Sequence, residues 1–356
     1  MSSAKKEVIM MLTQRQKAIL QAIVRQYTDT GQPVGSKVLA EILPVKVSSA
    51  TIRNEMVELE EQGLINKEHS SSGRVPSTTG YRYYVDHLLD QEAVDASDVA
   101  IIQNSFGTNF HKIDEIVSQS ADILSNLTSY TTFTLKPEQK SIRLSGFRLV
   151  PLGNHQVMAI LVTDTGEVES QTFAIPPDMN TDELESVIRL INDQLAGLPI
   201  SEVLQRLQAD IPMRVMQYMH SPNGVLDIFD NILSHAASER FFIGGRMNLL
   251  GFSHDSDPTV LQALYGLLDK NENLSDFLDP QNDDINVLIG SEISNKLLKD
   301  FSLITATYDV DQYGKGIIAV LGPTRMPYSR TIGIVSAFRQ ELARKLLEYY
   351  HHYYDQ

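Results

Sequence analysis

The stretch from Val47 to Pro76 constrains the fold of this chain more than any other part of the sequence. Ser48 and Ser49 are suited to begin a helix, because a serine oxygen accepts hydrogen bonds from the amides that a first turn leaves unpaired. Apolar side chains then recur at i, i+4 and i+7 and form one stripe: Ile52, Met56 and Leu59. Since such a stripe must face a core, the stretch predicts an amphipathic helix whose opposite face is open.

The open face of this helix carries polar side chains near its start. Arg53 and Asn54 are residue types that bond bidentately to guanine and adenine edges in a major groove. After Gly63, two short strands are predicted at Leu64 to His69 and Arg74 to Val75, around a tip of turn-forming residues. This is the ending of a winged helix-turn-helix, but a serine-capped helix followed by a hairpin also occurs in many other α+β folds.

Two helices predicted upstream favour the winged-helix interpretation. Thr13 and Gln16 have the form of a capping box that opens the first helix. Ser36 caps the second helix, which Pro44 closes. We expect its apolar side chains to point inward: Val38, Leu39 and Ile42. Three helices and a hairpin in this order predict a winged helix-turn-helix domain over residues 1–90.

The charge of the chain is divided unevenly. The net charge at pH 7 is -15, yet residues 1–89 hold eleven Lys or Arg against nine Asp or Glu, a balance of +2 that leaves -17 for the remainder. Only the first segment can approach a polyphosphate without strong repulsion. Because this segment is only weakly basic, we expect a dimer, which doubles the number of basic side chains at the DNA.

The predicted DNA contacts lie on and around the helix that follows Val47. Side chains at its start are expected to read bases: Ser49, Arg53 and Asn54, with Thr51 as a further DNA contact. Basic side chains before the helix and on the hairpin are expected to bind phosphates: Lys46, Lys67 and Arg74.

The composition excludes several other classes of protein. The chain has no cysteine, which excludes disulfides, thiolate zinc sites and a cysteine nucleophile, and suits a reducing cytosol. No stretch approaches the ~18 apolar residues of a membrane span, and the first apolar run is too short for a signal peptide. We therefore expect a cytoplasmic protein, associated with the nucleoid when bound to DNA and without membrane contact.

Two glycine-containing motifs resemble anion sites. Gly244 and Gly245 lack the glycine spacing and the Lys-Ser/Thr pair of a phosphate loop, so we expect a tight turn. The segment Gly322 to Arg325 follows a predicted strand and precedes a helix, so its amides and Arg325 are able to receive an anion. The alternative, which we favour, is that Thr324 caps the helix and Arg325 pairs with an acidic neighbour.

No pattern in the chain calls for a metal, a cofactor or catalysis. The adjacent His351 and His352 project from different sides of a helix, so we expect an exposed, frayed C-terminus rather than a metal site. His254 and its acidic neighbours have no metal-binding or hydrolytic spacing. We expect no catalytic residue.

The remainder of the chain alternates between helical and strand periods. Thr78 to Asp90 is predicted as a helix whose tyrosines lie in a core or interface rather than stack on bases. A connecting helix begins at Ile113. Strand-like runs follow from Ile142, and others precede a long helix from Tyr328 to Tyr350. Because these strand blocks flank a helical stretch, we predict one antiparallel sheet domain interrupted by an insertion.

Six motifs point to one known family. Four lie within residues 12–89: LTQRQKAIL, TGQPVGSKVL, VSSATIRNEMVELEEQGLI and SSGRVPSTTGYRYYVDHLL. Two more, GGRMNLL and LGPTRMPYSR, lie at residues 244–250 and 321–330. Together they resemble the HrcA family, the heat-inducible transcription repressors of bacteria. The chain departs from the family at Gly251, where a proline and an acidic residue are common, and at Ile293, where Glu-Asn is frequent.

The resemblance implies a multidomain α+β fold. Its parts are a winged helix-turn-helix over residues 1–90, a GAF-like antiparallel sheet domain formed by residues 91–199 and 258–356, and an inserted dimerisation subdomain at residues 200–257. It also implies a homodimeric repressor of heat-shock (chaperone) operons that binds an inverted-repeat operator in double-stranded DNA. Its activity is expected to be lowered by heat and supported by the GroE chaperonin. Two alternatives are a GAF-like domain that senses a small molecule and an enzyme with an attached winged helix.

Overall fold

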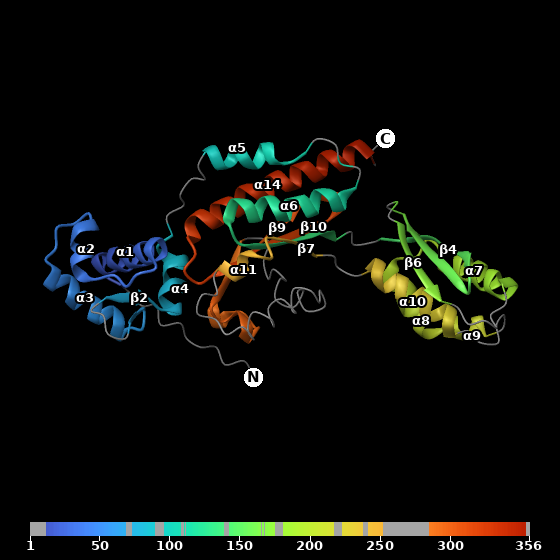
Figure 1. Ribbon diagram of the computed structural model, residues 1–356, viewed down its shortest axis with the longest axis horizontal. Helices are drawn as coiled ribbons and strands as arrows, with labels where there is room; N and C mark the ends of the chain where they lie inside the picture. The colour runs from blue at the N-terminus through green and yellow to red at the C-terminus, as the bar shows by residue number, and fades with distance from the viewer. Residues whose placement is uncertain are drawn as a thin grey trace. The chain divides into compact units, whose positions relative to one another are not determined.

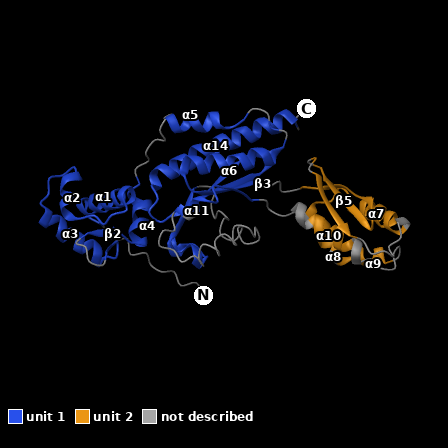
Figure 2. Ribbon diagram, in the orientation of Figure 1, with its two compact units in different colours: residues 1–137, 241–356 blue, residues 138–240 orange. Residues whose placement is uncertain are grey.

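The computed structural model divides the chain into two compact units (Figure 2). One unit comprises residues 1–137 and 241–356, and the other comprises residues 138–240. The described residues are 12–68, 73–89, 96–107, 110, 112–138, 142–164, 166, 168–174, 181–216, 223–237, 241–251 and 285–353.

The first unit begins with an N-terminal domain of four helices and a two-stranded hairpin (Figure 1). Its elements are α1 (Gln14–Thr30), α2 (Ser36–Ile42), α3 (Ser49–Glu61), β1 (Ile65–Lys67), β2 (Arg74–Pro76) and α4 (Thr78–His87). The strands pair antiparallel, with Lys67 opposite Arg74. This order of three helices and a hairpin is the predicted winged helix-turn-helix. Of the predicted hairpin tip, residues 70–73, only Gly73 lies within the described residues.

Local sequence signals account for the ends of α1. The Thr13 side chain accepts from the Gln16 amide while the Gln16 side chain accepts from the Thr13 amide, which is the predicted capping box. Gly31 ends the helix in a left-handed conformation with φ +65°. The prediction for α2 was wrong in part, since Val38 and Ile42 are 40% and 45% exposed. An amphipathic period alone does not say how wide the covered face of a short helix is.

A sheet domain completes the first unit. In the described part of this domain, the helices of four or more residues are α5 (Ala96–Ser105), α6 (Ile113–Thr128), α11 (Asn248–Gly251) and α14 (Tyr328–Tyr353). Its strands are β3 (Thr131–Glu138), β7 (Phe241–Gly244), β8 (Asn286–Ile289), β9 (Phe301–Asp309) and β10 (Lys315–Pro323), in the order β7-β3-β10-β9-β8. The described residues also form the 3-10 turns η2 (Gly290–Glu292), η3 (Lys296–Leu298) and η4 (Asp311–Tyr313). The long helices α6 and α14 lie together over the strands (Figure 1).

The core of the first unit is continuous from the N-terminal domain into the sheet domain. One cluster of buried apolar side chains includes Ile19 and Ile52 of the N-terminal domain together with Leu124 of α6 and Phe338 of α14. A separate cluster, which contains Phe133, lies on the sheet as well. The N-terminal domain is therefore packed against the sheet domain through apolar contacts.

The second unit is a three-stranded antiparallel sheet packed on helices. Its strands are β4 (Leu144–Gly153), β5 (Gln156–Thr163) and β6 (Val168–Ala174), in that order across the sheet. Its helices are α7 (Thr181–Leu195), α8 (Ile200–Ala209), α9 (Ile211–Val215) and α10 (Asn223–Ala237). Alternate β5 side chains such as Ala159 and Leu161 are fully buried against the helices. This alternation is what a sheet covered by helices on one face requires.

The boundaries of the insertion differ from the predicted ones. The sequence pattern assigned β4 to β6 to the interrupted sheet domain and placed the insertion at residues 200–257, whereas these strands share a core with α7 to α10 in the unit of residues 138–240. The chain instead leaves the interrupted sheet after β3 and returns to it in β7, and these two strands pair with each other. A strand's own residues do not specify its partner, which explains the difference. The predicted edges at residues 90 and 257 lie outside the described residues.

Candidate nucleic-acid interface

The helix α3 is held with one face in the core and the other open. Ser48 is its N-cap, and its Oγ accepts a 3.1 Å hydrogen bond from the Thr51 amide. The apolar stripe is buried, with exposures of 0%, 3% and 0% for Ile52, Met56 and Leu59. Because this stripe fixes the rotation of the helix, the side chains opposite to it must point outward.

The polar side chains at the start of α3 fall into two groups. Arg53 and Asn54 are exposed, and neither side chain has a hydrogen-bond partner among the described residues. Ser49 is half-buried, with its Oγ 2.9 Å from that of Ser36 on α2, and Thr51 Oγ1 lies 2.9 Å from Ser48 Oγ. Arg53 and Asn54 are thus free to bond to a ligand, whereas Ser49 and Thr51 also hold the local structure together.

The basic side chains around α3 also divide into exposed ones and one that is bonded within the domain. Lys46 and Lys67 are exposed. Arg74 is only 12% exposed in its side chain, and its Nη2 lies 2.7 Å from Glu60 Oε2 on α3. To bind a phosphate, Arg74 would have to leave this carboxylate. The pair of Glu60 with Arg74 was not predicted from the sequence. The only signal for it was the short stretch of chain between the end of the helix and the hairpin.

Two polar contacts anchor α3 to α1. Gln16 Nε2 donates a 2.7 Å hydrogen bond to Glu58 Oε2, and Arg15 Nη1 lies 3.2 Å from Glu55 Oε1. These acidic side chains of α3 are bound to α1 on the side away from Arg53. The negative charge of α3 is therefore partly compensated inside the domain.

Two of the three tyrosines of α4, Tyr81 and Tyr84, are core residues. Tyr81 and Tyr84 are 3% and 4% exposed, and the Tyr81 ring lies 5.7 Å from that of Tyr328 at the start of α14. Burial raises the pKa of both Tyr81 and Tyr328 above the ordinary range, so both phenols stay neutral. These tyrosines are not available to stack on bases, as the sequence predicted.

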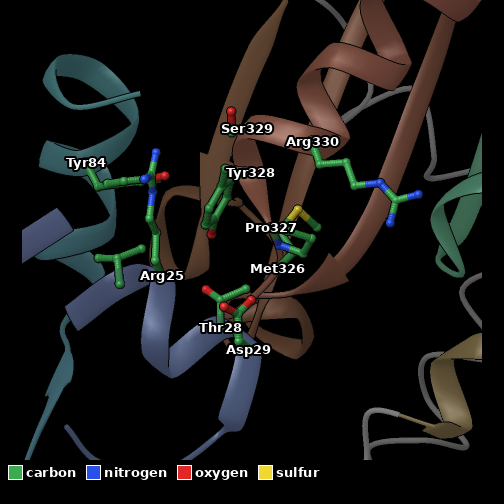
Figure 3. A pocket seen from close by; sticks show the side chains of 10 residues that line it. Arg25, Thr28, Asp29, Tyr84, Met326, Pro327, Tyr328, Ser329 and Arg330 are labelled. Atoms are coloured by element: carbon green, nitrogen blue, oxygen red, sulfur yellow. The ribbon is translucent and has the colours of Figure 1, made fainter. Parts of the chain in front are cut away.

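A cavity of about 180 Å³ lies between the N-terminal domain and the first turn of α14 (Figure 3). Arg25 and Asp29 of α1 line one side, and Ser329 and Arg330 of α14 line the other. The remaining lining residues are Val24, Thr28, Tyr84, Met326, Pro327 and Tyr328. None of the residues that line the cavity belongs to α3, so the cavity is separate from the exposed face of that helix.

The motif Gly244-Gly245 forms a tight turn, as predicted. A Cβ on Gly244 would lie 2.2 Å from the Ala121 carbonyl oxygen, and Gly245 has φ +63°. Asn248 closes the turn by donating 3.0 Å hydrogen bonds to Ser125 Oγ and to the Tyr130 carbonyl oxygen. Neighbouring atoms lie so close to the backbone at both positions that no side chain fits, which explains why both residues are glycines.

The segment before α14 differs from the favoured prediction. The helix begins at Tyr328, so Thr324 does not cap it; the Thr324 amide donates to the Asp300 carbonyl oxygen at 3.1 Å. Arg325 is exposed and pairs with no acidic side chain in the part of the chain that the structure describes. Its guanidinium lies instead over Gly31, at the end of α1.

The C-terminal end of α14 has an exposed side, as predicted, since His351, His352 and Tyr353 are exposed. The helix continues to Tyr353, and Tyr350 is 2% exposed and stacks on Tyr313 with ring centroids 3.9 Å apart. Within the described residues no cluster of three or more His, Asp or Glu side chains is arranged to hold a metal ion. Over the same residues, no helix is both long and apolar enough to cross a bilayer.

Comparison with known proteins assigns the chain to a family. Residues 11–85 match the family model of the winged helix-turn-helix transcription repressor HrcA DNA-binding domain, and residues 114–332 match that of the HrcA protein C-terminal domain. The chain belongs to the HrcA family. This family consists of DNA-binding transcription repressors and not of enzymes.

Relatives match the chain over nearly its whole length. The heat-inducible transcription repressor HrcA of Limosilactobacillus reuteri (strain DSM 20016) is 71% identical over 97% of this chain and 100% of its own. The protein of the same name from Pediococcus pentosaceus is 53% identical over 96% and 99%. A crystal structure of a protein described only as hypothetical has a TM-score of 0.64 at 23% identity, over 95% of this chain and 99% of its own. This likeness supports the fold.

Proposed function

We propose that this HrcA-family chain binds an inverted-repeat operator as a homodimer and thereby represses heat-shock (chaperone) operons. In a two-fold dimer, two α3 helices enter successive major grooves of the duplex. The occupied operator then hides the promoter. Heat lowers the active fraction, and the GroE chaperonin supports folding to the active form.

The exposed pair Arg53 and Asn54 carries this proposal. Both side chains are open on the outer face of α3, while the opposite face is buried. Arginine and asparagine are the side chains that bond bidentately to guanine and adenine. We propose Ser49 and Thr51 as further contacts beside them, and Lys46 and Lys67 as phosphate contacts. Arg74 is a phosphate contact in this proposal only if it leaves Glu60.

We propose dimerisation through the face of the sheet in residues 138–240 that no described helix of this unit covers. Apolar side chains meet on this face in register, with Val150 opposite Met158 and Val162 opposite Val168. Val150 and Val168 are 41% and 59% exposed. Ile160 lies between Arg148 and Ser170 at the centre of the face. An apolar patch of this kind on a sheet is suited to pack on a second copy of itself.

The response to heat follows from a small difference in free energy. A change of about 1.4 kcal/mol in the equilibrium between the DNA-competent and incompetent states alters their ratio tenfold. Warming or diversion of the chaperonin by other unfolded proteins is sufficient for a change of this size. The chaperonin part of the proposal rests on family membership.

A gel shift of the purified full chain tests the proposal. The probe duplexes are an inverted-repeat operator and a scrambled duplex of the same composition, with and without chaperonin and ATP, across a temperature ramp. We expect preferential binding to the operator, loss of the complex on warming, and recovery that depends on chaperonin. Equal binding to both duplexes at all temperatures would rule out the proposed function.

A second candidate function is a regulator that senses a small molecule. The cavity of about 180 Å³ beside the first turn of α14 favours it, because Arg25, Asp29 and Arg330 offer charged groups to a ligand there. This cavity lies at the start of α14 and not within the sheet of the domain that the sequence analysis named as the sensor. A ligand that changes operator affinity of the purified protein without chaperonin would support this alternative.

A further inference from the structure

Among the contacts that join the N-terminal domain to the sheet domain in the described residues, three lie away from α3 and involve long or aromatic side chains. The first is made by Arg82 of α4. Its Nε donates a 2.9 Å hydrogen bond to Glu292 Oε1, and its Nη2 bonds to Glu292 Oε2 and to the Val287 carbonyl oxygen. Burial lowers the pKa of Arg82, but the bonds to Glu292 and Asp86 outweigh it and the pKa is raised overall. The guanidinium is thus held charged between β8 and α4.

The second contact is apolar. Tyr81 and Tyr328 lie with ring centroids 5.7 Å apart at an interplanar angle of 53°. Both side chains belong to the core cluster that the two domains share. The Tyr81 hydroxyl has no hydrogen-bond partner among the described residues. This contact is therefore made by ring surfaces, and it buries the Tyr81 hydroxyl.

The third contact places Arg325 at the C-terminal end of α1. A Cβ on Gly31 would lie 2.4 Å from Arg325 Nη1. No residue in the last turn of α1 is basic, although the carbonyl end of a helix carries a partial negative charge. Arg325 supplies that positive charge from the sheet domain. Since it has no acidic partner in the described part of the chain, the end of α1 is what it faces.

The joined state leaves the candidate DNA-binding face open. Arg82 of α4 bonds to β8 and η2, and Arg325 contacts the end of α1, whereas Arg53 and Asn54 remain exposed on α3. The contacts are therefore compatible with DNA binding. Their physical effect is to fix the direction in which α3 points from the sheet domain.

We propose that Arg325, together with Arg82, is a positioning residue that makes the repressor select operators by half-site spacing. This inference rests on the proposed function, because spacing has a meaning only for a dimer on two half-sites. Two rigidly held recognition helices fit half-sites of one separation and helical phase. Without the two arginines, the apolar packing that includes Tyr81 and Tyr328 would hold the N-terminal domain in a wider range of directions. The dimer would then bind several separations with similar affinity.

Gly31→Ala is the sharpest variant for this proposal. The new Cβ pushes against the end of the flexible Arg325 side chain and displaces the guanidinium from α1. It also strains a left-handed residue, so Gly63→Ala serves as the matched control. Gly63 follows α3 with φ +73° and has nothing within 4 Å of an added Cβ. Both variants carry the same kind of backbone strain, and only one of them touches Arg325.

The first measurement compares operator duplexes whose half-sites are moved apart by about half a helical turn, roughly five base pairs. We expect the parent and Gly63→Ala to lose more than about tenfold in affinity on this change, and Gly31→Ala and Arg325→Ala to lose less than about threefold. The double variant Gly31→Ala/Arg325→Ala should match Arg325→Ala alone. If Arg325→Ala keeps the parent's spacing preference, the proposal is overturned.

The second measurement does not depend on DNA. The chain has no cysteine, so Glu61→Cys on the exposed end of α3 takes a single dye. Time-resolved anisotropy should show the dye-labelled domain rotating with the whole protein in the parent, and an added faster rotation in the Arg325→Ala background. A fast component in the parent itself would overturn the proposal. A further outcome is that the labelled domain is held in the parent and freed by Arg325→Ala, but the protein binds no operator. This result would support the role of the three contacts and rule out the proposed function.

Discussion

The guanidinium of Arg74 on strand β2 is bound to the carboxylate of Glu60 on α3. The Arg74 Nε donates a 2.9 Å hydrogen bond to Glu60 Oε2, and Nη2 lies 2.7 Å from the same oxygen. The pair connects the hairpin to the candidate recognition helix and offsets one of the positive charges of the N-terminal domain. Both the orientation of the hairpin and the local charge therefore depend on Glu60.

Replacing Glu60 with glutamine should weaken the hold on Arg74 and make its guanidinium easier for phosphates to bind, because an amide oxygen accepts a weaker hydrogen bond than a carboxylate. We expect Glu60→Gln to tighten binding to operator and random duplexes alike and to steepen the salt dependence by roughly one unit of slope. The measurement is the dissociation constant against salt concentration. Glu61→Gln removes the same charge from an exposed neighbour that has no bond to Arg74, so it isolates the effect of the more weakly held arginine. Equal slopes for the two variants would contradict the prediction.

Truncating Arg53 should affect sequence preference. Because its side chain is exposed and unbonded in the described part of the chain, Arg53→Ala should cost about 1–3 kcal/mol on the operator and little on random DNA. Lys67→Ala, from an exposed residue on β1, should weaken both duplexes by the same factor. Competition binding with the two duplexes separates these outcomes. An Arg53→Ala protein with the parent's preference would remove α3 as the base-reading helix.

A charge on the proposed dimerisation face of the sheet should prevent dimerisation. Ile160→Asp would bury a carboxylate if two copies pack there, so we expect monomers in sedimentation equilibrium and at least a ~tenfold loss of operator affinity. Met213→Asp is the control, since Met213 is 67% exposed on α9 of the same unit and away from the sheet face. A dimeric Ile160→Asp protein would show that the copies meet elsewhere.

Two buried tyrosines should respond to loss of the hydroxyl with opposite signs. The Tyr81 hydroxyl is buried without a partner among the described residues, so Tyr81→Phe should stabilise the fold by roughly 1 kcal/mol. Tyr308 donates a 2.6 Å hydrogen bond to the Leu135 carbonyl oxygen, so Tyr308→Phe should destabilise it by roughly 1–2 kcal/mol. Thermal unfolding midpoints of the two variants, measured against the parent, check both signs. A lowered midpoint for Tyr81→Phe would mean that its hydroxyl is bonded in solution.

Much of the N-terminal domain was predictable because its signals are local. The Thr13–Gln16 capping box, the Ser48 cap and the buried stripe on α3 each depend on residues within a few positions of one another. The open positions of Arg53 and Asn54 follow from that stripe. Strand β3 was not predicted, because no turn and second strand follow it directly. Its own residues alone do not identify it as a strand.

The sequence by itself determined where the helices of the N-terminal domain begin and which face of α3 is covered, since capping and periodicity act over one or two turns. Only the tertiary structure decided that β3 pairs with β7, that Glu60 holds Arg74 and that Arg325 lies over Gly31. Arg325 and Gly31 are far apart along the chain, and their contact depends on how two packed domains bring them together. Local patterns carry no information about such pairs, because the free energy that selects them comes from the burial of whole surfaces.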